Sequence, residues 1–199
     1  MISIFPTILH DFKSSDYNKE ELVNFCYSEK KRYPEGIKGR SNNGNSWHSS
    51  DHYMEEDNLI SSIIFSSINS YFNDREILKE ESQYCISNAW VNINSKGGSN
   101  SIHYHPGSSL SGVFWINVPK DSGELVFKNP NNFVEASTLS RYADHLTASF
   151  NKYETFYLEP KEGYMVLFPS HIQHLVRENK SNEDRIAISF NIVIKYSQD

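Results

Sequence analysis

Residues 80–199 consist of short segments in which apolar and polar residues alternate, and this pattern limits the possible folds more than any other feature of the chain. The segments are 84–93, 111–118, 123–127, 155–158, 164–168, 173–176 and 185–196. They are rich in Val, Ile, Tyr, Phe and Trp, and Pro and Gly residues separate many of them. Alternation with a period of two residues is typical of β-strands with one buried face. The pattern predicts a mainly β protein whose strands form a sandwich or barrel.

The first 79 residues predict a mainly helical lead-in to this β core. Ser15 and Asp16 are candidate caps of a helix that ends near Lys31. A second amphipathic helix is predicted over about residues 55–72, where apolar residues recur at helical spacing.

The polar stretch 39–50 between these helices is predicted to be a loop. Helices that precede a set of strands favour an arrangement in which the helices pack on the outside of the β core. We therefore expect one domain over residues 1–199, with a helical part to residue 79 and a β core from residue 80.

The composition excludes several classes of protein. The chain has 199 residues, of which 38% are hydrophobic and 22% charged, as in globular proteins. The net charge of −6 disfavours a nucleic-acid or membrane-surface partner, because such proteins usually carry a basic patch. No apolar run reaches the ~18 residues of a membrane-spanning helix, and the N-terminus lacks the pattern of a signal peptide. Cys26 and Cys85 provide no disulfide framework, so we expect reduced thiols in a cytoplasmic protein (the host cytoplasm if the source is viral).

His103 and His105 form the first candidate site. On an extended segment, residues i and i+2 point to the same side, so both imidazoles would face one point. Imidazole binds iron, zinc, copper and nickel well. Two histidines at this spacing also occur often by chance, and a polar loop flanked by glycines is the alternative.

A third metal ligand must come from elsewhere in the chain. His171 and His174 follow the predicted strand 164–168. His174 precedes an apolar pair and is expected at the edge of a strand, whereas His171 lies in a turn and is expected to be exposed. His174 is therefore the better candidate.

Arg185 opens the last predicted strand. Alternation places it on one face with Ala187, Ser189 and Asn191, while Ile186, Ile188, Phe190 and Ile192 form the other face. An arginine in this position can bind a carboxylate through two parallel hydrogen bonds. An ordinary half-solvated strand with an exposed arginine remains the alternative.

Taken together, these residues resemble the iron(II)- and 2-oxoglutarate-dependent oxygenases, and in particular a small branch found in bacteria and marine phages. The stretches that carry the resemblance are 41–42, 46–49, 88–92, 103–107, 110–115, 163–170 and 185–191. The resemblance covers most of the chain, and its order and spacing are more specific than any single motif.

The resemblance implies a double-stranded β-helix, or jelly-roll, fold. It implies iron(II) bound by His103, His105 and His174, and 2-oxoglutarate held through its far carboxylate by Arg185 and Ser189. With dioxygen as the second cosubstrate, such an enzyme hydroxylates its substrate and releases succinate and carbon dioxide.

Three further residues are weaker candidates for contacts behind the metal ligands or to substrate: Asn92, Asn191 and Trp115. His105 departs from the wider superfamily, in which an Asp or Glu usually stands at this position. The metal site therefore either has three histidines or takes a carboxylate from elsewhere.

Two other functions remain open. A cupin-type dioxygenase with three histidines would need no 2-oxo acid, but Arg185 would then have no evident role. A non-catalytic jelly roll that binds a partner would have no need of the complete set of three histidines and Arg185.

The substrate, a protein side chain or a small metabolite, is not identified by the sequence. The polar stretch 131–152 is interpreted as a lid, and an exposed edge strand is compatible with a homodimer.

Overall fold

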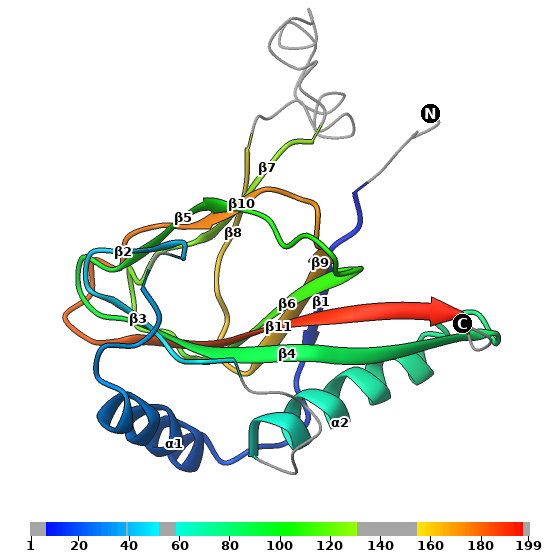
Figure 1. The fold of residues 1–199 in the computed structure, drawn as a ribbon, viewed down its shortest axis with the longest axis horizontal. Helices are drawn as coiled ribbons and strands as arrows, with labels where there is room; N and C mark the ends of the chain where they lie inside the picture. The colour runs from blue at the N-terminus through cyan, green and yellow to red at the C-terminus, as the bar shows by residue number, and fades with distance from the viewer. Residues whose placement is uncertain (1–6, 39, 52–58, 131–154, 197–199) are drawn as a thin grey trace, which may run out of the picture.

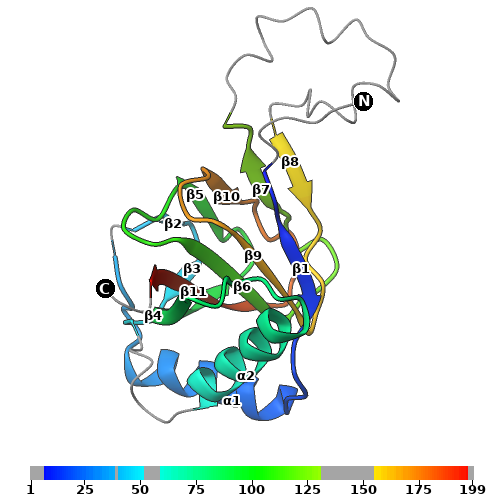
Figure 2. The same ribbon diagram turned by 90° about the vertical axis from the view of Figure 1, so that its right-hand side faces the viewer.

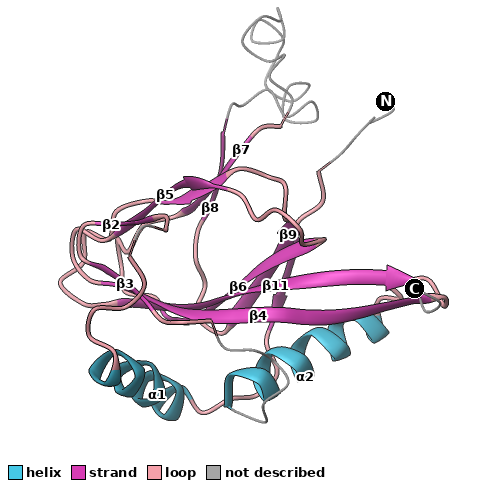
Figure 3. Ribbon diagram, viewed as in Figure 1, coloured by secondary structure: helices cyan, strands magenta, loops and turns pink. Residues whose placement is uncertain are grey.

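The computed structural model describes residues 7–38, 40–51, 59–130 and 155–196, which form two antiparallel sheets and two helices (Figures 1 and 3). The six-stranded sheet has the order β1-β9-β6-β11-β4-β3, and the five-stranded sheet has the order β2-β5-β10-β7-β8. The larger sheet consists of β1 (His10–Lys13), β3 (Ser46–His48), β4 (Ser82–Asn94), β6 (Leu110–Asn117), β9 (Tyr164–Pro169) and β11 (Arg185–Tyr196). The smaller sheet consists of β2 (Asn42–Asn43), β5 (Ser99–His103), β7 (Leu125–Lys128), β8 (Thr155–Leu158) and β10 (His174–Val176). This is the predicted double-stranded β-helix.

Helices α1 (Lys19–Arg32) and α2 (Leu59–Asp74) cover the outer face of the larger sheet (Figures 1 and 2). Apolar side chains of both helices pack there against β4, β6, β9 and β11 in the main hydrophobic core. The inner face of the same sheet looks toward the smaller sheet, and a second apolar cluster lies between the two. The prediction that the helices lie outside the β core is confirmed.

Strand β11 shows how alternation divides these two environments. Ile186, Ile188, Phe190 and Ile192 belong to the core under the helices, as predicted. The alternate residues, Arg185, Ala187, Ser189 and Asn191, all line a cavity between the sheets. One strand therefore contributes both to the main core and to the candidate site.

Gly112 on β6 is required by the close packing of this core. It is the direct register partner of Phe190, and a Cβ atom at position 112 would overlap the Phe190 ring. A glycine within a strand often marks such a close approach.

The N-terminal part differs from the sequence prediction in its short strands. The predicted loop 39–50 contains β2 and β3, and β1 was not predicted at all. All three are short, and they pair with the edges that β5, β4 and β9 offer. Phe12 of β1 and Trp47 of β3 are also buried in the main core. The helix cap is also different, since the side chain of Asn18 accepts a hydrogen bond from the Glu21 N–H.

Two predicted segments lie outside the residues that the structure describes. The interpreted lid, residues 131–152, lies outside them, as do residues 52–58 at the predicted start of the second helix. Neither described helix is long and apolar enough to cross a membrane.

Candidate metal centre

His103, His105 and His174 come together at one end of the smaller sheet. His103 and His174 are register partners on the neighbouring strands β5 and β10, and His105 lies two residues beyond His103. Nitrogen atoms of the three rings all lie within 4.8 Å of one another. The backbone N–H of His105 donates to Ser170 O at 2.9 Å, which fixes its loop against the segment that precedes β10.

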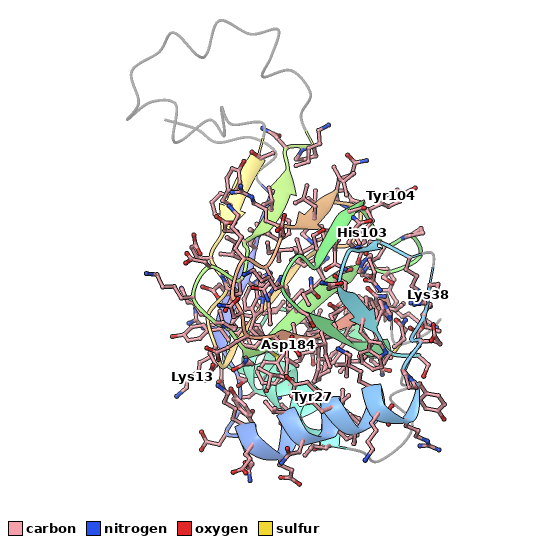
Figure 4. All side chains as sticks on the ribbon, turned by 90° about the vertical axis from the view of Figure 1, so that its left-hand side faces the viewer. Lys13, Tyr27, Lys38, His103, Tyr104 and Asp184 are labelled. Atoms are coloured by element: carbon pink, nitrogen blue, oxygen red, sulfur yellow. The ribbon has the colours of Figure 1, made fainter. Side chains whose placement is uncertain are left out.

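The alternation predicted around the first two histidines is visible in their neighbours. Tyr104 is 52% exposed, and Figure 4 shows it on the outside of the molecule beside His103. His171, expected in a turn, is exposed and does not join the cluster.

Hydrogen bonds orient each of the three imidazole rings through Nδ1. The Nδ1 of His103 lies 2.7 Å from Ser101 O, and that of His174 lies 2.9 Å from Ile172 O. The Nδ1 of His105 lies 2.7 Å from Asn191 Oδ1. These three oxygens are carbonyl oxygens, which only accept, so each Nδ1 carries the proton and each Nε2 has a free lone pair. A metal ligand needs such a lone pair.

Burial keeps these rings uncharged near neutral pH. Desolvation lowers the pKa of His103 and of His105 below its ordinary value. For His174, burial and the neighbouring His103 lower the pKa to about 3. Uncharged imidazole is the form that binds a metal ion.

Arg185 provides a buried positive charge to the cavity. Its side chain is 4% exposed, its Nε has no hydrogen-bond partner, and it forms no ion pair with the residues that the structure describes. Burial lowers the pKa of Arg185 to about 10, so the guanidinium stays charged at neutral pH. A buried charge without a partner is costly unless a ligand supplies the opposite charge.

The cavity that contains these groups has a volume of about 350 Å³. Ser189, Asn92 and Asn191 line it, and the side-chain amide of Asn92 donates to Ser189 Oγ at 2.9 Å. Trp115 does not line it, because its side chain is fully buried in the apolar cluster between the sheets.

Two lining residues were missed by the sequence analysis. His48 is buried, stacks on Trp90 with 5.4 Å between ring centroids, and donates from Nδ1 to Ser49 O. Burial lowers the pKa of His48 to about 4, so it is an uncharged group of the cavity wall. Arg40 also lines the cavity and forms an ion pair with Asp51. Both residues lie within the stretch 39–50 that was predicted to be a loop, where alternation gave no signal.

These residues fit iron(II) and a dicarboxylate. Three convergent imidazoles with free Nε2 atoms suit a first-row transition metal. A buried, unpaired guanidinium in the same cavity suits a carboxylate.

The family comparison agrees with this chemistry. The model of the family described as "Putative 2OG-Fe(II) oxygenase" matches residues 88–191, more than half of the chain. The chain belongs to this family. This oxygenase therefore uses iron(II), 2-oxoglutarate and dioxygen, and the first of the three functions considered from the sequence is confirmed.

Solved structures of low sequence identity share the fold. The viral collagen prolyl hydroxylase of Paramecium bursaria Chlorella virus-1, solved with 2-oxoglutarate, is 13% identical, with a TM-score of 0.57 and coverage of 92% of this chain and 94% of that one. The prolyl-4-hydroxylase of Pseudomonas putida is 12% identical, with a TM-score of 0.59 and coverage of 92% and 91%. The α-ketoglutarate-dependent carbocyclase SnoK from nogalamycin biosynthesis is 10% identical, with a TM-score of 0.63 and coverage of 94% and 81%. A comparison with curated protein sequences finds no match.

Proposed function

We propose that the oxygenase holds iron(II) through the Nε2 atoms of His103, His105 and His174 and hydroxylates a C–H bond of its substrate. Arg185 and Ser189 bind the far carboxylate of 2-oxoglutarate. The observation that carries this proposal is the buried, unpaired guanidinium of Arg185 in one cavity with three uncharged imidazoles.

When bound, iron would supply the activation of dioxygen, so that one oxygen atom enters succinate as 2-oxoglutarate loses carbon dioxide and the other enters the substrate. The protein supplies orientation and exclusion of water. Arg185 fixes one end of the cosubstrate by charge-assisted hydrogen bonds, and Ser189 adds a hydroxyl on the same face. Apolar side chains from both sheets line the same cavity and limit water: Val113, Leu125, Phe168 and Val176.

The ligand set carries less negative charge than the usual two histidines and one carboxylate. With His105 in the third position, all three protein ligands are neutral, so the site attracts an anionic cosubstrate more strongly. Three neutral ligands also stabilise higher oxidation states of iron less well than a carboxylate does.

The substrate belongs to the small molecules or peptides. A cavity of about 350 Å³ admits a metabolite or one amino-acid side chain. Two of the structural neighbours are named as prolyl hydroxylases and a third as a carbocyclase, so both kinds of substrate occur on this fold. The acidic net charge supports a substrate other than nucleic acid.

A cytoplasmic location and a homodimer stay predictions. The exposed Phe156 and Tyr157 on the edge strand β8 support the homodimer.

The test is anaerobic loading of the protein with iron(II) and then 2-oxoglutarate. Chelation of iron by the 2-oxo acid produces a weak visible charge-transfer band. We expect this band in the native protein, its loss in His174→Ala together with loss of iron, and a sharply raised requirement for 2-oxoglutarate in Arg185→Met.

Two exposed residues provide matched controls. His171→Ala removes a histidine three positions from His174, and Arg177→Met removes an arginine that pairs with Glu124 outside the cavity. Both variants should keep the band. A native protein that binds iron but shows no band would contradict the assigned cosubstrate site, and an unchanged band in His174→Ala would contradict the ligand set.

A further inference from the structure

The imidazole of His105 stands at one end of a continuous chain of side-chain hydrogen bonds. Its Nδ1 lies 2.7 Å from Asn191 Oδ1, and Asn191 Nδ2 donates to Asn88 Oδ1 at 3.0 Å. Asn88 Nδ2 in turn donates to Asp51 Oδ2 at 3.2 Å. Asp51 forms a two-pronged ion pair with Arg40, at 3.0 and 3.3 Å, beside the cavity. The chain therefore joins the candidate metal ligand to a carboxylate three hydrogen bonds away.

The carboxylate determines the direction of every bond in this chain. Asp51 can only accept, so Asn88 must turn its amide NH₂ toward it and its carbonyl oxygen toward Asn191. Asn191 must then present NH₂ to Asn88 and its carbonyl oxygen to His105. That oxygen can only accept, so His105 carries its proton on Nδ1 and keeps the lone pair on Nε2.

Without the carboxylate, the reverse direction becomes possible. If both amides turned over, Asn191 would donate to Nδ1 of His105, and the proton would move to Nε2. The Ser111 hydroxyl does not prevent this, because it lies 2.9 Å from both His105 Nδ1 and Asn191 Oδ1 and can donate or accept. A ring protonated on Nε2 offers no lone pair to a metal at that atom.

The tautomers of His103 and His174 do not depend on such a hydrogen-bonded side chain. Their Nδ1 atoms donate to backbone carbonyls two residues earlier in the chain, Ser101 O and Ile172 O, and a backbone carbonyl cannot turn into a donor. Only the tautomer of His105 depends on the orientation of a side-chain amide.

We propose that Asp51 is a positioning residue of the metal centre, which selects the metal-binding tautomer of His105 through Asn88 and Asn191. The inference rests on the proposed function, in which His105 is a metal ligand. Asp51 also polarises the chain, because each hydrogen bond shifts electron density toward the imidazole and makes it a better donor. The three proposed metal ligands include no carboxylate, but the carboxylate of Asp51 is linked to one of them, His105, through hydrogen bonds. Arg40, which forms the ion pair with Asp51, also lines the cavity.

The first test is the tautomer of His105 in the metal-free protein, read from long-range ¹H–¹⁵N NMR spectra. The native protein should show His105 protonated on Nδ1 alone. Asp51→Asn should show a mixture of both tautomers, because an amide at position 51 either donates or accepts. Anaerobic competition with a chromophoric chelator should show that the dissociation constant for iron(II) rises about 10-fold, at the low end of the effects seen when partners of metal ligands are removed.

The double variant Asp51→Asn/Asn191→Asp is the sharpest test. It keeps the same residue types but moves the carboxylate next to His105, where Ser111 and Asn88 can also donate to it. We expect the single Nδ1 tautomer and iron affinity within a few-fold of native. Asp11→Asn, which breaks the surface ion pair with Lys161, is the control and should change neither reading.

The outcomes separate this inference from the proposed function. If His105→Ala loses iron while Asp51→Asn keeps one tautomer and native affinity, the role of Asp51 is wrong and the ligand set stands. If His105→Ala keeps native iron affinity, the ligand set itself is wrong. If Asp51→Asn does not fold, as judged by circular dichroism, Asn88→Leu interrupts the chain while leaving the Asp51–Arg40 pair intact, and it should show the same mixture of tautomers. A single Nδ1 tautomer in folded Asn88→Leu would overturn the inference.

Discussion

Cys26 on α1 has a fully buried side chain, whereas the other cysteine, Cys85 on β4, is exposed. Burial raises the pKa of the Cys26 thiol from 9.0 to about 12, so the folded protein keeps a proton that the unfolded chain releases. This contribution to stability is complete below about pH 9 and is lost as the pH rises toward 12. We expect the free energy of unfolding, measured by urea denaturation, to fall steadily between about pH 9 and 11.

Single variants identify the source of this slope. Cys26→Ala should make it shallower, and Cys85→Ala should leave it unchanged. Some slope should persist in Cys26→Ala, because burial and the hydrogen bond to Asp184 also raise the pKa of Tyr27 to about 12. Figure 4 labels Tyr27 and Asp184, which join α1 to the start of β11. An equal slope in Cys26→Ala and the native protein would show that the thiol contributes nothing.

Sequence reasoning at this scale succeeded where a contact depends on local geometry. The spacing of His103 and His105 was enough to predict that both face one point, and alternation placed Arg185 and Ser189 on the cavity face. The hydrogen bond between His105 and Asn191 spans 86 positions and depends on how β11 pairs with its neighbours. Asp51 and Arg40 were missed for the same reason, because no pattern in the sequence indicates which side chains meet across two elements.

The connection between β10 and β11 is an element whose stability depends on one buried amide. Asn179 is fully buried, and its Nδ2 donates to Asn94 O at 2.7 Å and to Glu183 O at 2.8 Å, while Oδ1 accepts from Ser181 N–H. Asn179→Ala leaves two carbonyl oxygens without this donor. We expect the free energy of unfolding to fall by about 1–3 kcal/mol, as measured by urea denaturation.

The same variant should affect the cosubstrate site, because this connection leads directly into Arg185, the register partner of Asn94. We expect the KM for 2-oxoglutarate to rise more than kcat falls. Asn182→Ala is the matched control, since the side chain of Asn182 is exposed and accepts an exposed hydrogen bond from Lys96. It should change stability by less than about 0.5 kcal/mol. Equal stability losses in the two variants would contradict the role assigned to the buried amide.

The prediction of strands succeeded where β-forming residues and turn signals mark the segment, and failed for β2 and β3, which lack them. Residues 185–196 and 155–158 were predicted with the bounds of β11 and β8, because their β-formers and turn signals are local. Strands β2 and β3 consist of two and three residues, too few for alternation to be detected. They form because partners distant in the chain present free edges, a cause that lies outside the segments themselves.

The residues of the candidate site come from both sheets. The strands that carry His103 and His174 belong to the smaller sheet, whereas Arg185 and Ser189 belong to the larger one. A cosubstrate that chelates the metal at one end and meets Arg185 at the other therefore joins the two sheets. Ligand binding should stabilise the whole fold, because the unfolded chain has no such site.

We expect iron(II) and 2-oxoglutarate each to raise the melting temperature (Tm), measured by anaerobic thermal denaturation. Each such increment is called a step. Iron(II) alone should raise the Tm, and 2-oxoglutarate at about 100 times its dissociation constant should add ~2.7 kcal/mol. For a chain of this size that corresponds to roughly 5–10 °C. Arg185→Met should keep the step caused by iron and lose the step caused by 2-oxoglutarate, whereas Arg177→Met should keep both. A full rise in Tm with 2-oxoglutarate in Arg185→Met would show that the carboxylate binds elsewhere. The same rise in the absence of iron would show that 2-oxoglutarate binds without the metal, which would contradict a cosubstrate that joins the two sheets through the metal.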